Sequence, residues 1–283
     1  MKIAVISEND FGFSNSLKRL EHDTRSYKCS SFHSVCDDVC DGYKPDCIFL
    51  MDNGRIPPLF WDKSSIESHF GFCPVLVYFT REGSLKIPEG ELKKIKSSDL
   101  VFTQNNHWLA HLAFKKINIF RFPYWVDTKV FSPDGSVKQY DCISSTEDLG
   151  TADKAKTILS SRGLTFFNNP NCDSDFLNSG KIFLNFEKRI VTPRSFFEAS
   201  ACGLPILSAY LHECSEIESL FEEEREILYF SSLDECASRA YLYSRSSGER
   251  DRLTIKSFYL IEKYHTIEKR IRTFIKRIKI FRS

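Results

Sequence analysis

Short apolar runs recur along the chain and alternate with stretches whose apolar residues have helical spacing. In the first half the runs are rich in Val, Ile and Phe and are apolar at almost every position, as in strands buried on both faces of a parallel sheet. We expect strands at 2–7, 46–51, 74–79, 99–104 and 118–123, and helices at 14–20, 66–70, 89–96 and 106–117. The alternation predicts a doubly wound α/β domain over roughly the first 130 residues.

A second series of the same kind follows a linker at 126–140, where Pro133, Asp134 and Gly135 form a turn cluster. We expect strands at 140–145, 164–169, 181–186 and 204–209, and helices at 151–163 and 193–202. The chain therefore predicts two Rossmann-like α/β domains facing a cleft. Because ligands of open α/β sheets bind beyond the carboxyl ends of the strands, we expect the site there.

Composition narrows the class of protein. Of 283 residues, 42% are apolar and 27% charged, which is typical of a globular chain. The net charge of +1 gives the whole molecule no strong preference for nucleic acid or membrane. No run of apolar residues is long enough for a transmembrane helix, and the acidic turn after the first apolar run indicates a strand rather than a signal peptide.

The cysteines and histidines do not predict a metal site. Cys36 and Cys40 lie four apart, but no second pair completes a zinc set. His107 and His111 share a helical face without an acidic neighbour. We expect reduced thiols in a cytoplasmic protein and no bound metal.

The C-terminal residues combine a basic face with an apolar stripe. Ile267, Ile271, Phe274, Ile278 and Phe281 have the spacing of one helical face. Seven basic residues and no acid lie between 269 and 282: Lys269, Arg270, Arg272, Lys276, Arg277, Lys279 and Arg282. We predict a basic amphipathic helix over 256–283. Its basic face is either solvated or attracted to an anionic membrane or a phosphate-bearing acceptor.

The segment 181–209 is the most informative for chemistry. Thr192 is a good N-cap, Pro193 suits the first helical position and Gly203 suits the position after the helix. The helix begins where a strand ends, so its free N–H groups suit a diphosphate. Arg194 and Glu198 share one face, either as an ordinary exposed ion pair or as part of a site. The apolar neighbours favour the site.

RSFFEASACGLPILS in this segment resembles the signature of group 1 glycosyltransferases, most closely their spore-maturation-type branch. Further segments are similar in order and spacing, so that the resemblance covers most of 95–275. They are LNSGKIFLNF with Lys181 and Asn185, YFSSLDECASRA, KYHTIEKRI, SSDLVFTQN and FPYWVDTKVFSP.

The resemblance implies a GT-B fold and metal-independent transfer of a sugar from a UDP- or GDP-linked donor. Residues 1–134 would form the acceptor-side domain, 135–255 the donor domain, and 256–283 a helix crossing back to the first domain. Glu198 would accept hydrogen bonds from the donor's ribose, and Arg194 or Lys181 would neutralise the diphosphate. The donor-binding set implied as a whole is Glu198, Arg194, Lys181, Asn185, Ser195, Gly203 and Lys154.

One position departs from the family pattern, and two further assignments depend on weaker signals. Many retaining members carry a second Glu eight residues before the ribose-binding one, where this chain has Ile190, so the stereochemical outcome stays open. Glu82 is a possible catalytic base if the enzyme inverts, and Gly12 could admit substrate on the acceptor side.

Other functions are weighed against transfer. The absence of G-x-G-x-x-G after the first strand argues against a dinucleotide-dependent oxidoreductase. A non-catalytic glycosyltransferase-like scaffold is the main alternative, and an epimerase of the same architecture is a third. The acceptor stays open, with glycan, lipid-linked, protein and DNA acceptors all compatible.

Overall fold

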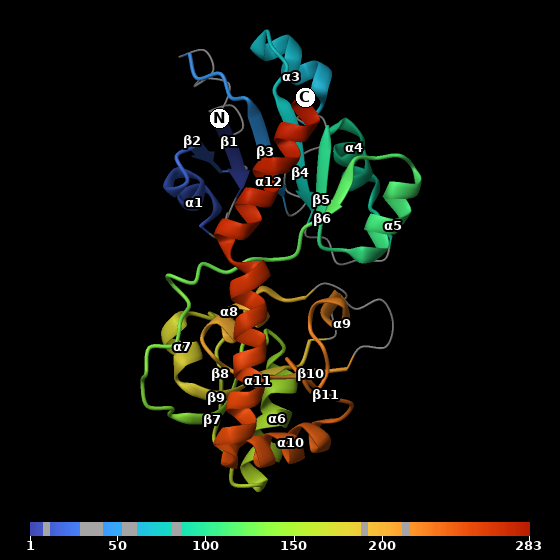
Figure 1. Ribbon diagram of the computed structural model, residues 1–283. Coiled ribbons are helices and arrows are strands. Elements are labelled where there is room, and N and C mark those ends of the chain that lie inside the picture. Colours follow the sequence, from blue (N-terminus) through green and yellow to red (C-terminus); the bar gives the residue numbers. More distant parts are fainter. Residues whose placement is uncertain (8–11, 29–41, 53–60, 81–85, 188–191, 211–215) are drawn as a thin grey trace. The chain divides into compact units, whose positions relative to one another are not determined.

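The computed structural model describes residues 1–7, 12–28, 42–52, 61–80, 86–187, 192–210 and 216–283. The chain divides into two compact units, Met1–Pro123 with Ile267–Ser283 and Tyr124–Thr266. Each unit is built on one parallel sheet with helices around it (Figure 1). The predicted pair of α/β units is confirmed.

The first unit contains a parallel sheet in the order β2-β1-β3-β4-β5-β6. Strands β1 and β4 are buried along almost their whole length, which agrees with their continuous apolar runs. The polar strand β2 was not predicted, because it pairs only with β1 at the sheet edge and its sequence DTRSY has no apolar run. The bounds are β1 Lys2–Ser7, β2 Asp23–Tyr27, β3 Cys47–Asp52, β4 Val75–Thr80, β5 Leu100–Thr103 and β6 Ile119–Arg121.

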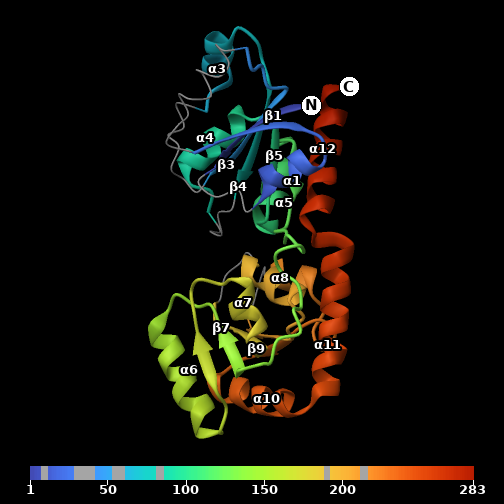
Figure 2. The ribbon, with the colours of Figure 1, turned by 90° about the vertical axis from the view of Figure 1, so that its left-hand side faces the viewer.

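The described helices of the first unit are α1 Phe13–Arg19, α3 Lys63–Phe70, α4 Glu89–Ser97, α5 Asn106–Phe114 and α12 Ile267–Arg282. Helix α12 runs alongside α1 (Figure 2). The ring of Phe274 on α12 lies 4.5 Å from that of Phe49 and 5.4 Å from that of Phe13, centroid to centroid. The last residues of the chain therefore complete the core of the first unit, as predicted for the C-terminal helix.

The second unit contains a parallel sheet in the order β11-β10-β9-β7-β8. One face packs against α6 and α10, and the other against α8 and the residues that follow α11. The strands are β7 Tyr140–Ser144, β8 Phe166–Asn168, β9 Gly180–Asn185, β10 Ile206–Ala209 and β11 Leu228–Phe230. The helices are α6 Leu149–Ser161, α7 Ser174–Asn178, α8 Arg194–Ala201, α9 Glu216–Leu220, α10 Leu233–Arg245 and α11 Ser247–Leu260.

The C-terminal region is interrupted, so the expected helix over 256–283 is wrong in its extent. After α11 comes a π-helix, η3 Ile261–His265, and then Thr266 is extended with ψ 151°. Val126 explains the break, because its N–H donates to the carbonyl of His265 at 3.0 Å and it forms a bridge with Thr266. Within α12 Ile275 joins the buried stripe, whereas Phe281 is 41% exposed.

The two units divide at residues 123 and 124, earlier than the expected boundary at 134. Residues after Pro123 already contribute Val126 and Phe131 to the core of the second unit. In the described parts of the chain no helix is both long and apolar enough to cross a membrane.

Candidate functional site

Helix α8 begins beyond the carboxyl end of β9, the position at which open parallel sheets bind ligands. Pro193 occupies the N-cap position, so the expectation that Thr192 caps the helix is wrong by one residue. Without a capping side chain, the first turn presents backbone N–H groups and the positive end of the helix dipole. This end of α8 can therefore hold an anion.

Arg194 and Glu198 form an ion pair on this helix, between Nη2 and Oε1. The side chain of Glu198 is only 3% exposed, whereas that of Arg194 is 31% exposed and lies 5.9 Å from the ring centroid of Phe131. Burial raises the pKa of Glu198 to about 7, and the nearby guanidinium offsets only part of this shift. The pair is a buried carboxylate with a basic partner that reaches the solvent.

Asn185 is buried at the carboxyl end of β9. Its Nδ2 donates to Ser208 Oγ on β10 and to the carbonyl of Glu187, both at 3.0 Å. These bonds hold the amide in place where the two neighbouring strands end. Asn185 therefore lies at the same edge of the sheet as the start of α8, as the sequence predicts.

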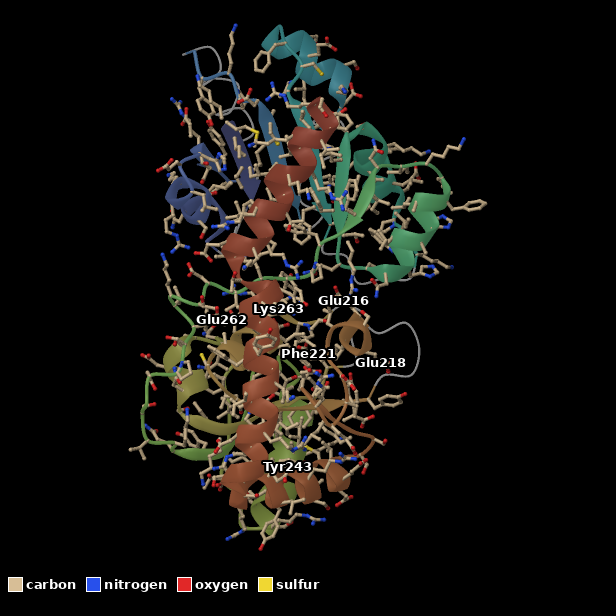
Figure 3. All side chains as sticks on the ribbon, viewed as in Figure 1. Glu216, Glu218, Phe221, Tyr243, Glu262 and Lys263 are labelled. Carbon is tan, nitrogen blue, oxygen red and sulfur yellow. The ribbon has the colours of Figure 1, made fainter. Side chains whose placement is uncertain are left out.

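Glu216 was not predicted and is 1% exposed at the start of α9. Its Oε2 accepts a hydrogen bond from the N–H of Thr192 at 3.0 Å, which ties α9 to the residues before α8. Figure 3 shows Glu216 with Glu218 on this short helix. Glu216 stands in a run of acids spaced for an exposed helix, so no local signal indicates its burial.

Two buried hydroxyl groups lie on or directly before α8. The side chains of Thr192 and Ser200 are fully buried, and among the described residues neither hydroxyl has a hydrogen-bond partner. Apart from Nη2 of Arg194, Glu198 Oε1 has no polar partner among the described residues. Because buried polar groups without partners are costly, their concentration around α8 is typical of a ligand site.

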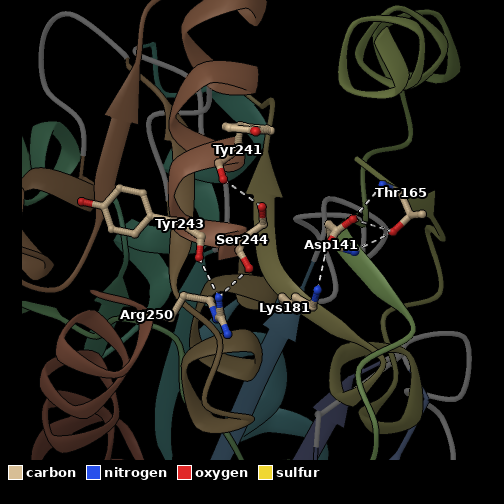
Figure 4. A network of polar contacts seen from close by, with 7 residues as sticks. All are labelled: Asp141, Thr165, Lys181, Tyr241, Tyr243, Ser244 and Arg250. Atoms are coloured by element: carbon tan, nitrogen blue, oxygen red, sulfur yellow. Dashed lines mark hydrogen bonds and ion pairs between the residues drawn. The ribbon is translucent and has the colours of Figure 1, made fainter. Parts of the chain in front are cut away.

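Lys181 lies near the amino ends of the strands (the amino edge), opposite to the carboxyl ends where α8 begins (the carboxyl edge). This position corrects its expected place beside the diphosphate. Its Nζ is 2.7 Å from Asp141 Oδ1, and Asp141 Oδ2 accepts bonds at 3.0 Å from the backbone N–H and the hydroxyl of Thr165 (Figure 4). Lys181 is the second residue of β9 and Asn185 the last, and four residues of strand span about 13 Å. The structure does not bring Lys181 together with Arg194 and Glu198.

Gly203 also differs from its expected role. It follows the end of α8, at the far end of the helix from Arg194, with φ 76°. A Cβ there would lie 3.3 Å from Pro133 Cγ and 3.6 Å from Thr254 Cγ2. Gly203 therefore ends the helix and permits close packing rather than contacting a ligand bound at its start.

The remaining predicted residues occupy separate places. Ser195 is partly exposed in the first turn of α8, and Lys154 is exposed on α6. Gly12 precedes α1 in the first unit with φ 80°. Glu82 and Ile190 lie outside the described residues.

Comparison with known proteins agrees with this architecture. Residues 174–276 match the sequence model of the family described as "Glycosyl transferase-like". No curated protein matches the chain. Residues 174–276 are therefore similar to this family, and the chain as a whole has the GT-B fold. The matched segment contains β9, α8 and α9.

Solved structures similar to this chain show the same fold over almost its whole length. Sucrose-phosphate synthase from Thermosynechococcus elongatus is 9% identical with TM-score 0.69, over 99% of both chains. A glycosyltransferase from Rickettsia africae is 11% identical with TM-score 0.69, over 99% of this chain and 98% of that one. Anabaena Alr3699/HepE, in complex with UDP and glucose, is 11% identical with TM-score 0.65, over 99% of both.

Proposed function

We propose that the protein transfers a sugar from a nucleotide-diphosphate sugar to an acceptor, and that the donor's nucleotide binds at the carboxyl end of β9 and the start of α8. The observation that carries this proposal is Glu198, a buried carboxylate with a pKa of about 7 beside a partly exposed Arg194. A titratable group of this kind at the ligand-binding edge of a parallel sheet is typical of a functional site.

Each group has a chemical task in this arrangement. The diphosphate accepts hydrogen bonds from Arg194 and from the first-turn N–H groups of α8, where Ser195 also lies. Glu198 accepts hydrogen bonds from the two ribose hydroxyls, which its two oxygens match. These donors stabilise the charge that develops on the departing nucleoside diphosphate, so the proposal needs no metal ion.

Supporting residues complete the proposed donor site. Asn185 is held at the end of β9, and Lys154 on α6 belongs to the helix that follows β7 in the same sheet. Lys181 is left out because it lies at the amino edge of the sheet, and Gly203 because it lies at the far end of α8. The solved structure of HepE holds UDP and glucose, which makes UDP-glucose the first donor to test.

The acceptor belongs to the first unit in this proposal. Thr80 and Thr103 end β4 and β5 and are buried, and Gly12 precedes α1. Gln104 follows β5 and is fully buried, yet neither polar atom of its amide has a partner among the described residues. These polar groups at the carboxyl edge suit the hydroxyl groups of a glycan or of a lipid-linked sugar. Glu82 supplies the catalytic base if the reaction inverts.

A donor panel tests the proposal and separates it from a non-catalytic binding role. UDP-, GDP-, ADP- and CDP-linked sugars are first compared by thermal shift, since a ligand of the folded state raises its apparent stability. Nucleotide release from the best ligand is then followed without acceptor. We expect one nucleotide class to stabilise the protein and to be released slowly. Stabilisation without release, with or without a glycan acceptor, identifies a binding protein, and no stabilisation by any donor refutes the site.

A further inference from the structure

A groove of about 470 Å³ lies on the first unit between the end of α1 and one face of α12. Leucine and isoleucine side chains form much of its lining, with basic residues beside them. The residues are Leu20, His22, Ile271, Arg272, Ile275, Lys276, Lys279 and Ile280. Among the described residues no carboxylate lines the groove, which therefore combines an apolar surface with positive charge.

Six of the seven basic residues of α12 fall into two groups. Arg277 and Arg270 lie over the rings of Phe120 and Phe122, at 4.3 and 5.9 Å. Arg282 pairs with Asp46 at 3.0 Å. These cations help to hold α12 on the first unit.

Arg272, Lys276 and Lys279 form the second group and line the groove. All three are exposed, and within the described parts of the chain none of them forms an ion pair or a side-chain hydrogen bond. Their spacing of four and three residues places them on one face of the helix. The helix therefore presents a row of uncompensated positive charge along an apolar groove.

His22 reports the electrostatic character of this groove. Burial lowers its pKa, and the positive charges of the N-terminal amino group and Lys279 lower it further. Its Nδ1 is buried and has no hydrogen-bond partner among the described residues. A neutral imidazole beside unpaired cations leaves the groove positive without a compensating group.

Two exposed apolar residues lie at the end of α12, and the first of them, Ile280, lines the groove. Ile280 is 57% exposed and Phe281 is 41% exposed, although the same helix buries Ile271, Phe274 and Ile278 completely. An exposed apolar pair beside unpaired cations is the composition of helices that lie at a membrane interface. A soluble polyanion would use the cations and leave the isoleucine surface without a partner.

We propose that this groove and the adjoining face of α12 attach the protein to the surface of an anionic phospholipid membrane. Arg272, Lys276 and Lys279 bind lipid phosphates, while Ile280 and Phe281 enter the boundary between head groups and acyl chains. The attachment is peripheral and reversible. It does not depend on the donor site, so it can hold or fail whatever the outcome of the sugar-transfer assay.

Co-sedimentation with vesicles tests the attachment. Wild-type protein is mixed with vesicles of phosphatidylcholine alone, or of phosphatidylcholine with phosphatidylglycerol. The salt concentration is about 20 mM for weak screening and about 500 mM for strong screening. We expect binding to anionic vesicles at low salt, weakened at high salt, and little binding to neutral vesicles. No binding of the wild type to anionic vesicles at low salt overturns the proposal, including the case in which a DNA oligonucleotide binds instead.

Matched variants locate the surface. Arg272→Ala/Lys276→Ala/Lys279→Ala should weaken partitioning onto anionic vesicles on the order of a hundred-fold, since each basic residue contributes about fivefold near such a surface. Lys96→Ala/Lys115→Ala/Lys156→Ala removes the same charge from exposed positions elsewhere and should change it little. Equal losses in the two variants overturn the proposal, because net charge alone would then explain binding.

Two further variants separate charge from packing. Arg272→Lys/Lys276→Arg/Lys279→Arg keeps the charge and should bind vesicles as the wild type does. Ile280→Ser/Phe281→Ser should lower the binding that persists at high salt. Loss of binding in the charge-conserving variant, or unchanged binding in the serine variant, contradicts the corresponding half of the proposal.

Discussion

The two edges of the sheet in the second unit each carry a basic–acidic pair, and the two carboxyl groups behave in opposite ways. Burial would raise the pKa of Asp141 at the amino edge, but hydrogen bonds from Lys181 and Thr165 outweigh it and hold the pKa below its usual value. At the carboxyl edge burial dominates, and the pKa of Glu198 rises to about 7 although Arg194 is in contact.

The difference lies in how far the protein itself satisfies each carboxylate. Asp141 receives hydrogen bonds from Lys181 and from both donors of Thr165. Glu198 has Arg194 alone, and the buried hydroxyl of Thr192, just before the same helix, also lacks a partner in the described parts of the chain. A complete network indicates a structural role, whereas an incomplete buried one indicates groups that a ligand would satisfy.

The largest effect expected from this comparison is on nucleotide binding. Glu198→Ala should weaken binding of the donor nucleotide by about ten- to a hundred-fold, because a charged hydrogen bond is worth about 1.5–3 kcal/mol. Lys181→Ala removes a charge from the same sheet and should leave affinity unchanged. Calorimetric titration of both variants decides the matter, and a greater loss for Lys181→Ala would reverse the assignment of the two edges.

A second effect concerns stability. The folded-state pKa of Glu198 lies above its ordinary value of 4.5, so the folded state binds the proton more tightly and stability falls as pH rises from about 4.5 to about 7. Glu198→Gln removes this cost and should raise the free energy of unfolding at pH 8 by on the order of 2 kcal/mol, with little change at pH 4. In this variant the guanidinium of Arg194 is not left as a buried unpaired charge, because its side chain is 31% exposed and reaches the solvent. Urea unfolding at the two pH values measures the difference, and a less stable variant at pH 8 contradicts it.

The pH dependence of nucleotide affinity sharpens the same point. Ribose hydroxyls donate to the ionised form of Glu198, so binding should release a proton and weaken below pH 7, by up to about tenfold per pH unit. The phosphates of the nucleotide also titrate in this pH range. The Glu198→Gln variant shows how much of the pH dependence of affinity is due to them. Affinities are measured between pH 5.5 and 8. Identical pH profiles for the wild type and the Gln variant would show that Glu198 does not titrate on binding.

The smallest expected effect is at the amino edge. Lys181→Met should lower stability at neutral pH by less than about 1 kcal/mol, since the Lys181–Asp141 pair is partly exposed and screened by solvent. The folded-state pKa of Asp141 is depressed, so this contribution is present above the ordinary pKa and is lost as pH falls through the folded value. Denaturant midpoints at neutral and acidic pH test it, and a loss that persists in acid would point to packing instead.

Local pattern was enough to locate most strands and helices. The apolar runs of β1, β4 and β9 match their burial, and Pro193 and Gly203 bracket α8 to within a residue. Such features depend on backbone periodicity and on the restricted dihedrals of proline and glycine, which neighbouring residues alone define. The polar edge strand β2 was missed because it has no such pattern.

Which charged groups lie close together could be read only from the tertiary structure. Lys181, Glu198 and Glu216 all stand in segments that mix apolar and polar residues. In the structure Lys181 pairs with Asp141 at the amino edge, whereas Glu198 is buried on α8 and Glu216 is buried against Thr192. The seven basic residues at the C-terminus likewise form one set in the sequence, but packing of α12 gives some of them partners and leaves Arg272, Lys276 and Lys279 along a groove. The sequence by itself determined most of the elements and the two parallel α/β units, because these follow from local periodicity. Only the tertiary structure decided which polar groups are satisfied, because their partners come from segments distant in the chain.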